Sequence, residues 1–351
     1  MYTKEQIMSV LEKAYEDSRF ILLGEQLIGP KDLPNDMFGR FSEATGGRKP
    51  AILGLDLACY GLDLMNVGIN TERWKLIIDQ VTAFAEEGGI VTASSHFANP
   101  IPRPDVTAPC RGAFGGLDSW EDLLTEGTEM NKIFKEELLT DGEFLRQLGE
   151  RGVTVLWRPL HEANSGSFWY CGRAHGEPGI TWMDGNNLKR LWKYIYNLYV
   201  NEMGLTNLIW VYAPNNQGTW SGNCDVNYYY PGDEYVDMVG LDWYTRSKQE
   251  IIVPKHSYDK MMGKGKVCAM TEFGPAGDLA MREDHEAQEK VFNAVDMLNL
   301  YKDLSKRGLK IAYVLTWHEN FGAIHSIGRG KEAFDDGFFY DLERLKAIYS
   351  K

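Results

Sequence analysis

Strand-like and helix-like segments alternate along the whole chain. Eight short apolar runs, rich in β-branched and aromatic residues, are separated by longer stretches in which apolar residues recur with helical spacing. Such alternation predicts a parallel sheet with right-handed helical crossovers. The predicted strands are Phe20–Glu25, Ile52–Leu57, Ile90–His96, Val153–Glu162, Leu208–Tyr212, Val236–Tyr244, Val267–Glu272 and Ile311–Trp317. Eight repeats fit a closed (β/α)8 barrel, also called a TIM barrel.

Glycines support this rhythm, because they stand where predicted helices end and the next strand is about to begin. A helix often ends with a left-handed residue, and glycine adopts that conformation most easily. Five glycines occupy such positions: Gly88, Gly152, Gly204, Gly265 and Gly308. The helical patterns themselves are clearest over residues 188–199 and 291–301. We therefore expect a strand after each of these helix ends.

The main alternative fold is an open, doubly wound sheet. Such sheets commonly carry a G-x-G-x-x-G turn after the first strand, and the segment LLGEQLIGP lacks it. No linker or low-complexity segment divides the 351 residues, so we expect one domain over residues 1–351. A minimal barrel needs about 250 residues. The rest is predicted to form long βα loops at Ile28–Pro50, Phe97–Ser119, Ala163–Asp184, Ala213–Asp233 and Glu319–Asp336.

The charge balance limits the partners. The chain has 37 Lys and Arg against 50 Asp and Glu, a net charge of −13. Binding to nucleic acid or to an anionic membrane would need a basic surface, so neither is expected. The first twenty residues read as an amphipathic helix rather than a signal peptide. We expect a monomer that is either secreted, with its leader absent from this chain, or intracellular.

Polar and aromatic residues gather where the predicted strands end. The carboxyl ends of the strands carry the active site in (β/α)8 barrels. The residues found there are His96, Arg158, His161, Glu162, Asn164, Asp242, Tyr244, Glu272, Trp317 and His318. Two of them, Glu162 and Glu272, are isolated glutamates on predicted strands 4 and 7. One could be a polar plug paired with arginine, but two at one barrel mouth indicate a function, since buried acids are costly.

Two facing carboxyl groups suit glycosidic cleavage, which needs one acid to protonate the leaving oxygen and one carboxylate to meet the developing oxocarbenium ion. This chemistry needs neither a metal nor a cofactor, and we expect none. The pair His161-Glu162 is no zinc signature, because the second histidine of H-E-x-x-H is missing and the pair follows a strand. No C-x-x-C pair occurs among the five cysteines either.

The residues around both glutamates resemble glycoside hydrolase family 26, whose members are mainly β-1,4-mannanases. The resemblance spans residues 24–321, and its most specific part is WRPLHEANSGSFWYCG at 157–172. AMTEFG at 269–274, HFANP, VGLDWY and YVLTWHEN support it. The chain departs from the family at Ser167, where Trp is common, and at His318, where Arg is frequent. Both positions bear on sugar binding.

The resemblance implies a role for each residue. Glu162 would be the acid/base and Glu272 the nucleophile, with Tyr244 donating a hydrogen bond to Glu272. The residues implied in substrate binding are His96, His161, Asn164, Phe168, Trp169, Asp242, Tyr244, Trp317 and His318, with Trp317 forming the floor under the sugar. Arg158 and Asn164 are expected to orient the two glutamates.

We therefore predict a retaining endo-β-1,4-mannanase that acts on mannan or glucomannan by double displacement. Its two carboxyl groups should then lie about 5 to 5.5 Å apart. Alternatives within the family are a β-1,3-1,4-glucanase, a β-1,3-xylanase and an exo-acting mannobiohydrolase. A catalytically silent carbohydrate-binding barrel is the alternative outside enzymes.

Overall fold

The computed structural model describes residues 1–17, 19–27, 38–58, 61–102, 112–171, 185–216, 224–245, 251–276, 296–317 and 334–349. Among these residues, no helix is long and apolar enough to span a membrane.

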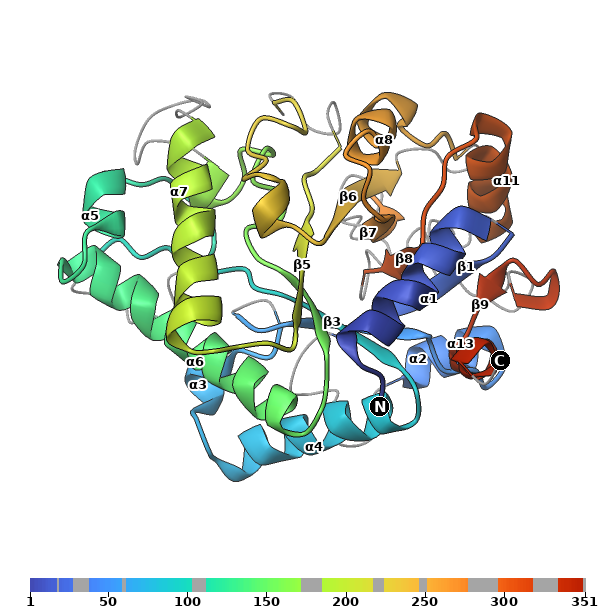
Figure 1. Ribbon diagram of the computed structural model, residues 1–351, viewed down its shortest axis with the longest axis horizontal. Helices are drawn as coiled ribbons and strands as arrows, with labels where there is room; N and C mark the ends of the chain where they lie inside the picture. Colours follow the sequence, from blue (N-terminus) through green and yellow to red (C-terminus); the bar gives the residue numbers. More distant parts are fainter. Residues whose placement is uncertain are drawn as a thin grey trace, which may run out of the picture.

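Eight parallel strands close into a barrel, as predicted (Figure 1). Neighbours in sequence are neighbours in space from β1 to β8, and β1 pairs with both β2 and β8, which closes the sheet. The strands are β1 Ile21–Gln26, β2 Ile52–Asp56, β3 Ile90–Ser94, β4 Val155–Arg158, β5 Leu208–Tyr212, β6 Met238–Thr245, β7 Cys268–Pro275 and β8 Tyr313–Thr316. The open-sheet alternative is thereby excluded.

Two predicted strands end at least two residues earlier than expected. The β3 strand stops at Ser94 rather than at His96, and β4 stops at Arg158 rather than at Glu162. Beyond β4 the backbone turns left-handed at Leu160, with φ of 52°, which no strand tolerates. A short ninth strand, β9 (Phe339–Tyr340), was not predicted and pairs with the start of β1.

Helices connect the strands and surround the barrel (Figure 1). Those in the described residues are α1 Lys4–Asp17, α2 Gly39–Thr45, α3 Leu64–Val67, α4 Glu72–Glu86, α5 Trp120–Leu124, α6 Glu129–Glu150, α7 Gly185–Tyr196, α8 Lys255–Met262, α11 Met297–Arg307 and α13 Leu342–Tyr349. A π-helical turn, Asn197–Glu202, continues α7. The short α2 lies inside the predicted loop 28–50, which is therefore not all loop.

Helix ends follow the sequence signals. Thr71 and Thr128 cap the starts of α4 and α6 by accepting backbone N–H bonds. All five glycines predicted to be left-handed have φ between 64° and 104°. The predicted helix over 188–199 matches α7 and its π-helical turn, whereas α11 begins at Met297, and residues 291–295 lie outside the described residues.

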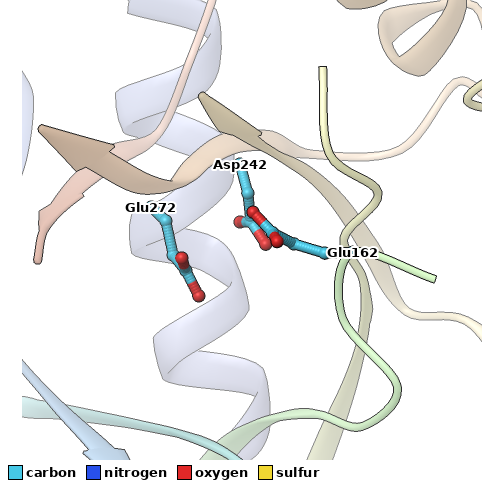
Figure 2. Close-up of side chains that lie close together, drawn as sticks. All are labelled: Glu162, Asp242 and Glu272. Carbon is cyan, nitrogen blue, oxygen red and sulfur yellow. The ribbon is translucent and has the colours of Figure 1, made fainter. Parts of the chain in front are cut away.

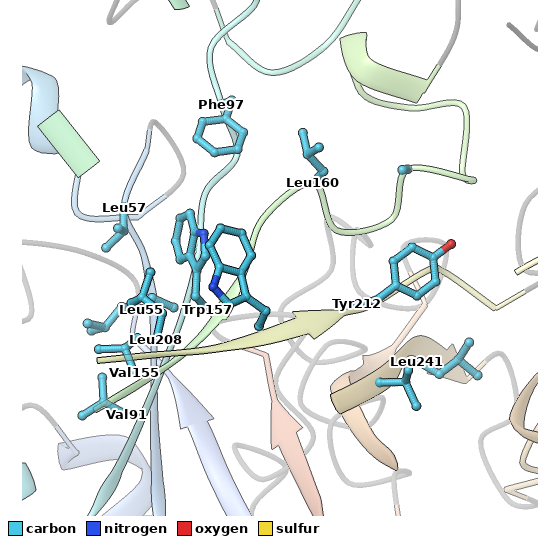
Figure 3. Close-up of a cluster of buried hydrophobic side chains, with 14 of the residues drawn as sticks. Leu55, Leu57, Val91, Phe97, Val155, Trp157, Leu160, Leu208, Tyr212 and Leu241 are labelled. Carbon is cyan, nitrogen blue, oxygen red and sulfur yellow. The ribbon is translucent and has the colours of Figure 1, made fainter. Parts of the chain in front are cut away.

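Strand residues alternate between two apolar layers. One set points outward and belongs to the cluster shared with the buried helix residues; Figure 3 shows Leu55, Val91, Val155 and Trp157 of this set lying together. The other set points into the barrel and forms a separate cluster that contains Leu22, Ile52, Ile90, Leu156, Met238 and Tyr313. This period-two pattern is what a sheet covered on both faces requires.

The first helix, α1, seals the amino end of the barrel. Its buried residues Ile7, Val10, Leu11 and Ala14 belong to the same cluster as the inward-facing strand residues. Lys4 donates to the Leu208 carbonyl oxygen at 2.9 Å, which ties the start of α1 to β5. The amino end is thus filled with apolar side chains, which leaves the carboxyl end for polar groups.

Candidate active site

Three carboxylates meet at the carboxyl ends of the strands (Figure 2). Glu162 lies beyond β4, Asp242 is on β6 and Glu272 is on β7, and one oxygen of each lies within 4.8 Å of the other two. Oxygen ligands at this spacing could also hold a cation. The described residues already supply a positive charge here, which is the guanidinium of Arg158.

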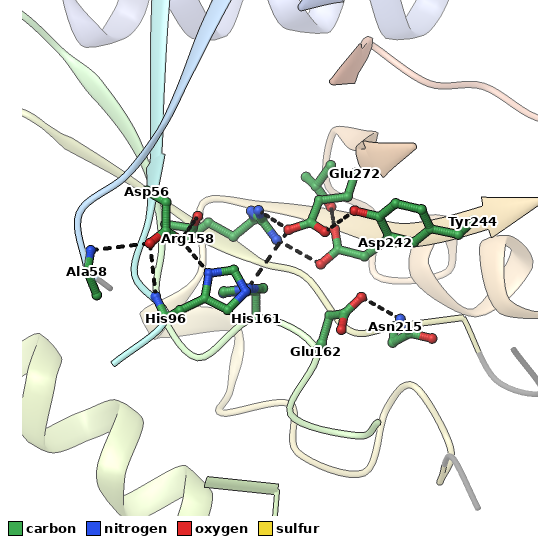
Figure 4. Close-up of polar contacts among 12 residues, drawn as sticks. Asp56, Ala58, His96, Arg158, His161, Glu162, Asn215, Asp242, Tyr244 and Glu272 are labelled. Carbon is green, nitrogen blue, oxygen red and sulfur yellow. Dashed lines mark hydrogen bonds and ion pairs between the residues drawn. The ribbon is translucent and has the colours of Figure 1, made fainter. Parts of the chain in front are cut away.

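Arg158 links two of these carboxylates. Its Nη1 donates to Asp242 Oδ2 at 2.7 Å and its Nη2 to Glu272 Oε1 at 2.6 Å (Figure 4). The side chain is 2 % exposed, so both ion pairs are shielded from solvent. Burial opposes the charge on Arg158, but Asp242 and Glu272 outweigh it and raise the pKa of the guanidinium. Arg158 thereby holds one oxygen of Glu272 in place.

Asp242 faces the protein rather than the cleft. It is fully buried, and its second oxygen, Oδ1, accepts from Thr271 Oγ1 at 2.6 Å. With the side chain fully buried and both oxygens bonded within the protein, Asp242 is not exposed to a sugar. The expectation of substrate contact is corrected here: Asp242 holds Arg158.

Tyr244 reaches Glu272 from β6. Its hydroxyl donates to Glu272 Oε2 at 2.7 Å, the contact that the family resemblance implies. Burial and the charge of Glu272 raise the pKa of Tyr244 well above its usual value, so the hydroxyl keeps its proton. Arg158 therefore donates to one oxygen of Glu272 and Tyr244 donates to the other.

Glu162 sits in a strained turn after β4. Its own φ is 53°, a left-handed conformation that costs on the order of 1 kcal/mol for a residue with a side chain. Its backbone N–H donates to the Ala213 carbonyl oxygen at 2.8 Å, and Asn215 Nδ2 donates to its Oε1 at 2.5 Å. Burial and the nearby charge of Glu272 raise the pKa of Glu162 to about 7. An acid so tuned can hold a proton near neutral pH.

Asn164 holds this turn in place. Its Nδ2 donates to the Asn215 and Cys224 carbonyl oxygens at 2.8 and 3.1 Å, and its Oδ1 accepts from the Asn215 N–H at 2.7 Å. The side chain is fully buried. The predicted substrate contact is therefore corrected, because these bonds use a fully buried side chain to fix the backbone of Asn215, the residue that binds Glu162.

Two histidines lie beside the carboxylates. His96 Nε2 and His161 Nε2 are 3.0 Å apart, and His161 Nε2 is 3.9 Å from Glu272 Oε1. His96 Nδ1 is 2.5 Å from Asp56 Oδ2 (Figure 4). Asp56, at the tip of β2, was missed in the sequence. The signal that could have found it is the alternation along β2. Ile52, Gly54 and Asp56 share the inward face of this strand, so the Asp56 carboxylate points into the barrel mouth.

The aromatic residues divide into two groups. Phe168 and Trp317 lie beside His96, with ring centroids 5.0 and 5.9 Å from its imidazole. Trp169 is 0 % exposed, and its Nε1 donates to the Phe97 carbonyl oxygen at 2.8 Å, so it is a core residue. Its predicted substrate contact is corrected. His318 lies outside the described residues.

Phe114 extends the aromatic group toward solvent. Its ring is 57 % exposed and stacks on Phe168 with centroids 5.8 Å apart. Sequence reasoning missed it, because a single Phe in a long loop carries no periodic signal. An exposed ring that stacks on Phe168 is a surface on which an apolar sugar face can stack.

Comparisons with known proteins show which family this chain resembles. The family model described as glycosyl hydrolase family 26 matches residues 2–319. The chain is 29 % identical over 285 residues to a mannan endo-1,4-beta-mannosidase of Bacillus subtilis, covering 80 % of this chain and 69 % of the relative. A mannan endo-1,4-beta-mannosidase of Bifidobacterium adolescentis is 27 % identical over 297 residues, which cover 79 % of this chain and 27 % of that relative.

Solved structures show the same fold. A mannanase structure from Bacillus subtilis superposes with a TM-score of 0.72 at 24 % identity, over 97 % of this chain and 93 % of that one. A beta-mannanase from a symbiotic protist of the termite Reticulitermes speratus, complexed with a gluco-manno-oligosaccharide, superposes with a TM-score of 0.70 at 20 % identity, over 97 % and 94 %.

Proposed function

The chain belongs to glycosyl hydrolase family 26, and from this premise we propose that it is a retaining endo-β-1,4-mannanase acting on mannan and glucomannan. It is a glycoside hydrolase by its family and by its named relatives. The observation that carries the mechanistic part is the carboxylate pair: an oxygen of Glu162 lies within 4.8 Å of an oxygen of Glu272. Such closeness supports retention, since inverting enzymes separate the pair by about 6.5 to 9.5 Å to admit water.

In the first step, the Glu272 carboxylate attacks the anomeric carbon while Glu162 gives its proton to the departing glycosidic oxygen. Tyr244 and Arg158 each hold one oxygen of Glu272, which aligns the carboxylate. The pKa of Glu162, raised to about 7, keeps the acid protonated below neutral pH.

In the second step, Glu162, now ionised, takes a proton from water, and the resulting hydroxide attacks the glycosyl–Glu272 ester. The C–O bond to Glu272 breaks and the sugar leaves with its original configuration. Loss of charge on Glu272 during the first step lowers the pKa of Glu162, which suits its change from acid to base.

Relatives named as mannan endo-1,4-beta-mannosidases support mannan as the substrate. The test is an assay of the purified protein on mannan, glucomannan, lichenan and β-1,3-xylan, with the anomer of the first product followed by proton NMR. We expect hydrolysis of the two mannans with initial β-anomer. Preference for lichenan would favour the β-1,3-1,4-glucanase. Inactivity on all four polysaccharides would favour a carbohydrate-binding barrel. An initial α-anomer would refute the retaining mechanism.

The two glutamates can be told apart by their variants. Glu272→Ala and Glu162→Ala are each expected to lose more than about 10³-fold in kcat on mannan while remaining folded. On an aryl β-mannoside with a good leaving group, Glu162→Ala should still form the glycosyl-enzyme in a burst, because that leaving group needs no proton. Glu272→Ala should show no burst, and Glu150→Ala, on the exposed face of α6, is the matched control. Normal turnover by either active-site variant contradicts the assignment.

We also propose that the enzyme acts outside the cell as a monomer. A mannan polymer is too large to cross a membrane unaided, so a secreted enzyme meets its substrate directly. Size-exclusion chromatography and assay of culture supernatant from the native host check both points.

A further inference from the structure

We propose that Asp56 is a positioning residue for the reaction: from the tip of β2 it holds His96 by Nδ1 and thereby keeps a positive imidazolium facing His161 and the two glutamates. The inference rests on the proposed roles of Glu162 and Glu272. Asp56 touches neither of them, so it acts through His96.

The surroundings of Asp56 are built to hold a charged carboxylate. The side chain is 1 % exposed, and it accepts from Ser94 Oγ at 3.1 Å and from the Ala58 N–H at 3.2 Å, besides its contact with His96 (Figure 4). A buried carboxylate without partners would be expensive. Here burial opposes the charge, but His96 and the donors outweigh it and hold the pKa of Asp56 below its usual range.

A continuous row of groups runs from Asp56 to the proposed nucleophile. Asp56 Oδ2 is 2.5 Å from His96 Nδ1, His96 Nε2 is 3.0 Å from His161 Nε2, and His161 Nε2 is 3.9 Å from Glu272 Oε1. Two nitrogens at 3.0 Å share a single proton. The contact between the histidines therefore requires one of them to donate and the other to accept.

Asp56 fixes the proton on His96 Nδ1 and supplies the counter-charge for a charged His96, and the charge on His96 then decides which histidine donates. A carboxylate at Nδ1 demands a proton there, so the Nδ1 of His96 is always a donor. If His96 is charged, its Nε2 also donates, and His161 accepts in its neutral form. If His96 is neutral, its Nε2 accepts, and the proton must come from His161. Without Asp56 the charged form of His96 would lose its counter-charge.

The balance of charges favours an imidazolium on His96. Burial opposes that charge, but Asp56, Glu272 and Glu162 outweigh it and raise the pKa of His96. His161 differs, because burial and the charges of His96 and Arg158 lower its pKa well below the usual value. His161 is therefore the neutral acceptor of the pair.

Other titratable groups pack against this row from α6 and from the segment after β4. Glu137 and Asp141 of α6 lie near Asp56, and burial raises the pKa of both, that of Asp141 to about 8. The Tyr170 hydroxyl donates to the His161 carbonyl oxygen at 3.0 Å, and burial raises its pKa as well. Burial thus opposes a charge on all three groups, and Asp56, which contacts His96 directly, is the carboxylate that balances it.

This arrangement has a kinetic consequence. The positive charge on His96 lowers the pKa of Glu162 and thus limits how far burial and Glu272 raise it. Removing the charge of Asp56 should discharge His96 and let the pKa of Glu162 rise. The alkaline limb of kcat/KM, which reports the acid of the free enzyme, should then move to higher pH.

The decisive variant is Asp56→Asn, which keeps the shape and an oxygen acceptor but removes the charge. We expect the alkaline limb to shift upward by on the order of one pH unit. We also expect kcat/KM at its optimum to fall by about tenfold to a hundredfold, as is common when the partner that orients a working histidine is lost. A limb that stays at the wild-type pH overturns the proposal, because a purely structural role would lower activity without moving it.

Glu137→Gln is the matched control. Glu137 is buried near Asp56 and accepts the Ala98 N–H with both carboxyl oxygens, and burial raises its pKa well above its usual value. Its replacement changes a buried acid in the same region and leaves the contact between Asp56 and His96 in place. The alkaline limb should therefore stay where it is in the wild type, and a shift equal to that of Asp56→Asn would count against a specific role of Asp56.

A double-mutant cycle tests whether Asp56 acts through His96. In a His96→Ala background, Asp56→Asn should change kcat/KM by less than about threefold, because the residue through which it acts is gone. If the fold-changes in kcat/KM of the two single substitutions multiply in the double variant, as they do for independent sites, this link is refuted.

A direct measurement covers the case in which the variants fail to fold. Nitrogen-15 NMR of the wild-type protein labelled at its seven histidines reports the protonation of each ring nitrogen. We expect His96 to keep its Nδ1 proton throughout and to titrate above about 6.5. The proposal is overturned if His96 loses its Nδ1 proton before its Nε2 proton, or if His96 titrates below about 6.5. This measurement needs no turnover, so it stands apart from any failure of the proposed function.

Discussion

The two ends of the barrel interior use the same strands in opposite ways. At the amino end the inward-facing residues are apolar, such as Ile52 and Leu156, and α1 covers them. Farther along the same strands, at the carboxyl end, the inward-facing residues are Asp56 and Arg158. Both ends are buried, but among the described residues the charged side chains that point into the barrel lie at the second.

This contrast separates stability from chemistry. The apolar end needs only volume and shape, and burial there stabilises the fold. Each charge at the polar end needs a partner, so Arg158 is matched by Asp242 and Glu272, and Asp56 by His96. The polar end should therefore fail in activity and stability together, and the apolar end in stability alone.

The largest effect is expected for Arg158→Met. Without the guanidinium, the buried carboxylates of Asp242 and Glu272 lose the cation that pairs with both, which should cost about 3 to 5 kcal/mol of unfolding free energy. Activity should be lost as well, because Glu272 is no longer aligned. Urea unfolding and a mannan assay measure the two effects. Wild-type stability in this variant would mean that the ion pairs are not shielded as the geometry indicates.

The next effect is expected for Leu11→Ala, in the seal at the amino end. Leu11 is fully buried against the inner strand residues, so its truncation should leave a cavity and cost about 2 to 5 kcal/mol. The kcat and the pH profile should stay as in the wild type at temperatures where the variant is folded. A changed pH profile would show that the two ends are coupled, contrary to the comparison.

The smallest effect concerns pH and stability at Glu162. Its pKa is about 7 in the folded protein against an ordinary value near 4.5, so between these values the folded state binds more protons than the unfolded state. Stability from this group is therefore complete below the lower value and is lost as pH rises toward 7.

Comparison of the wild type with Glu162→Gln isolates this contribution. Urea unfolding at pH 5 and pH 7 should show a decline in the wild type that is larger than in the variant by about 1 to 2 kcal/mol. The amide can still accept from Asn215 but carries no titrating proton. Equal declines in the two proteins would mean that Glu162 titrates normally.

Much of the fold was readable from the sequence because its signals are local. Strand periodicity, the helix-ending glycines and the absence of a phosphate-binding turn each act over a few residues. Predictions failed where the outcome depended on distant partners. Trp169 is aromatic and near Glu162 in the sequence, yet it is buried and its Nε1 donates to the Phe97 carbonyl oxygen. The Asn164 side chain bonds to the backbone of Asn215.

By itself, the sequence determined the eight-fold strand–helix alternation and the placing of Glu162 and Glu272 at strand ends, since hydrophobic period and chain order specify both. Only the tertiary structure decided which polar groups at the barrel mouth face one another. Two such sets of contacts join residues that lie on different strands or just after them. Arg158 binds Asp242 and Glu272, and Asp56 binds His96. Such pairs arise from barrel closure and from the need of buried charges for partners, and no local pattern encodes them.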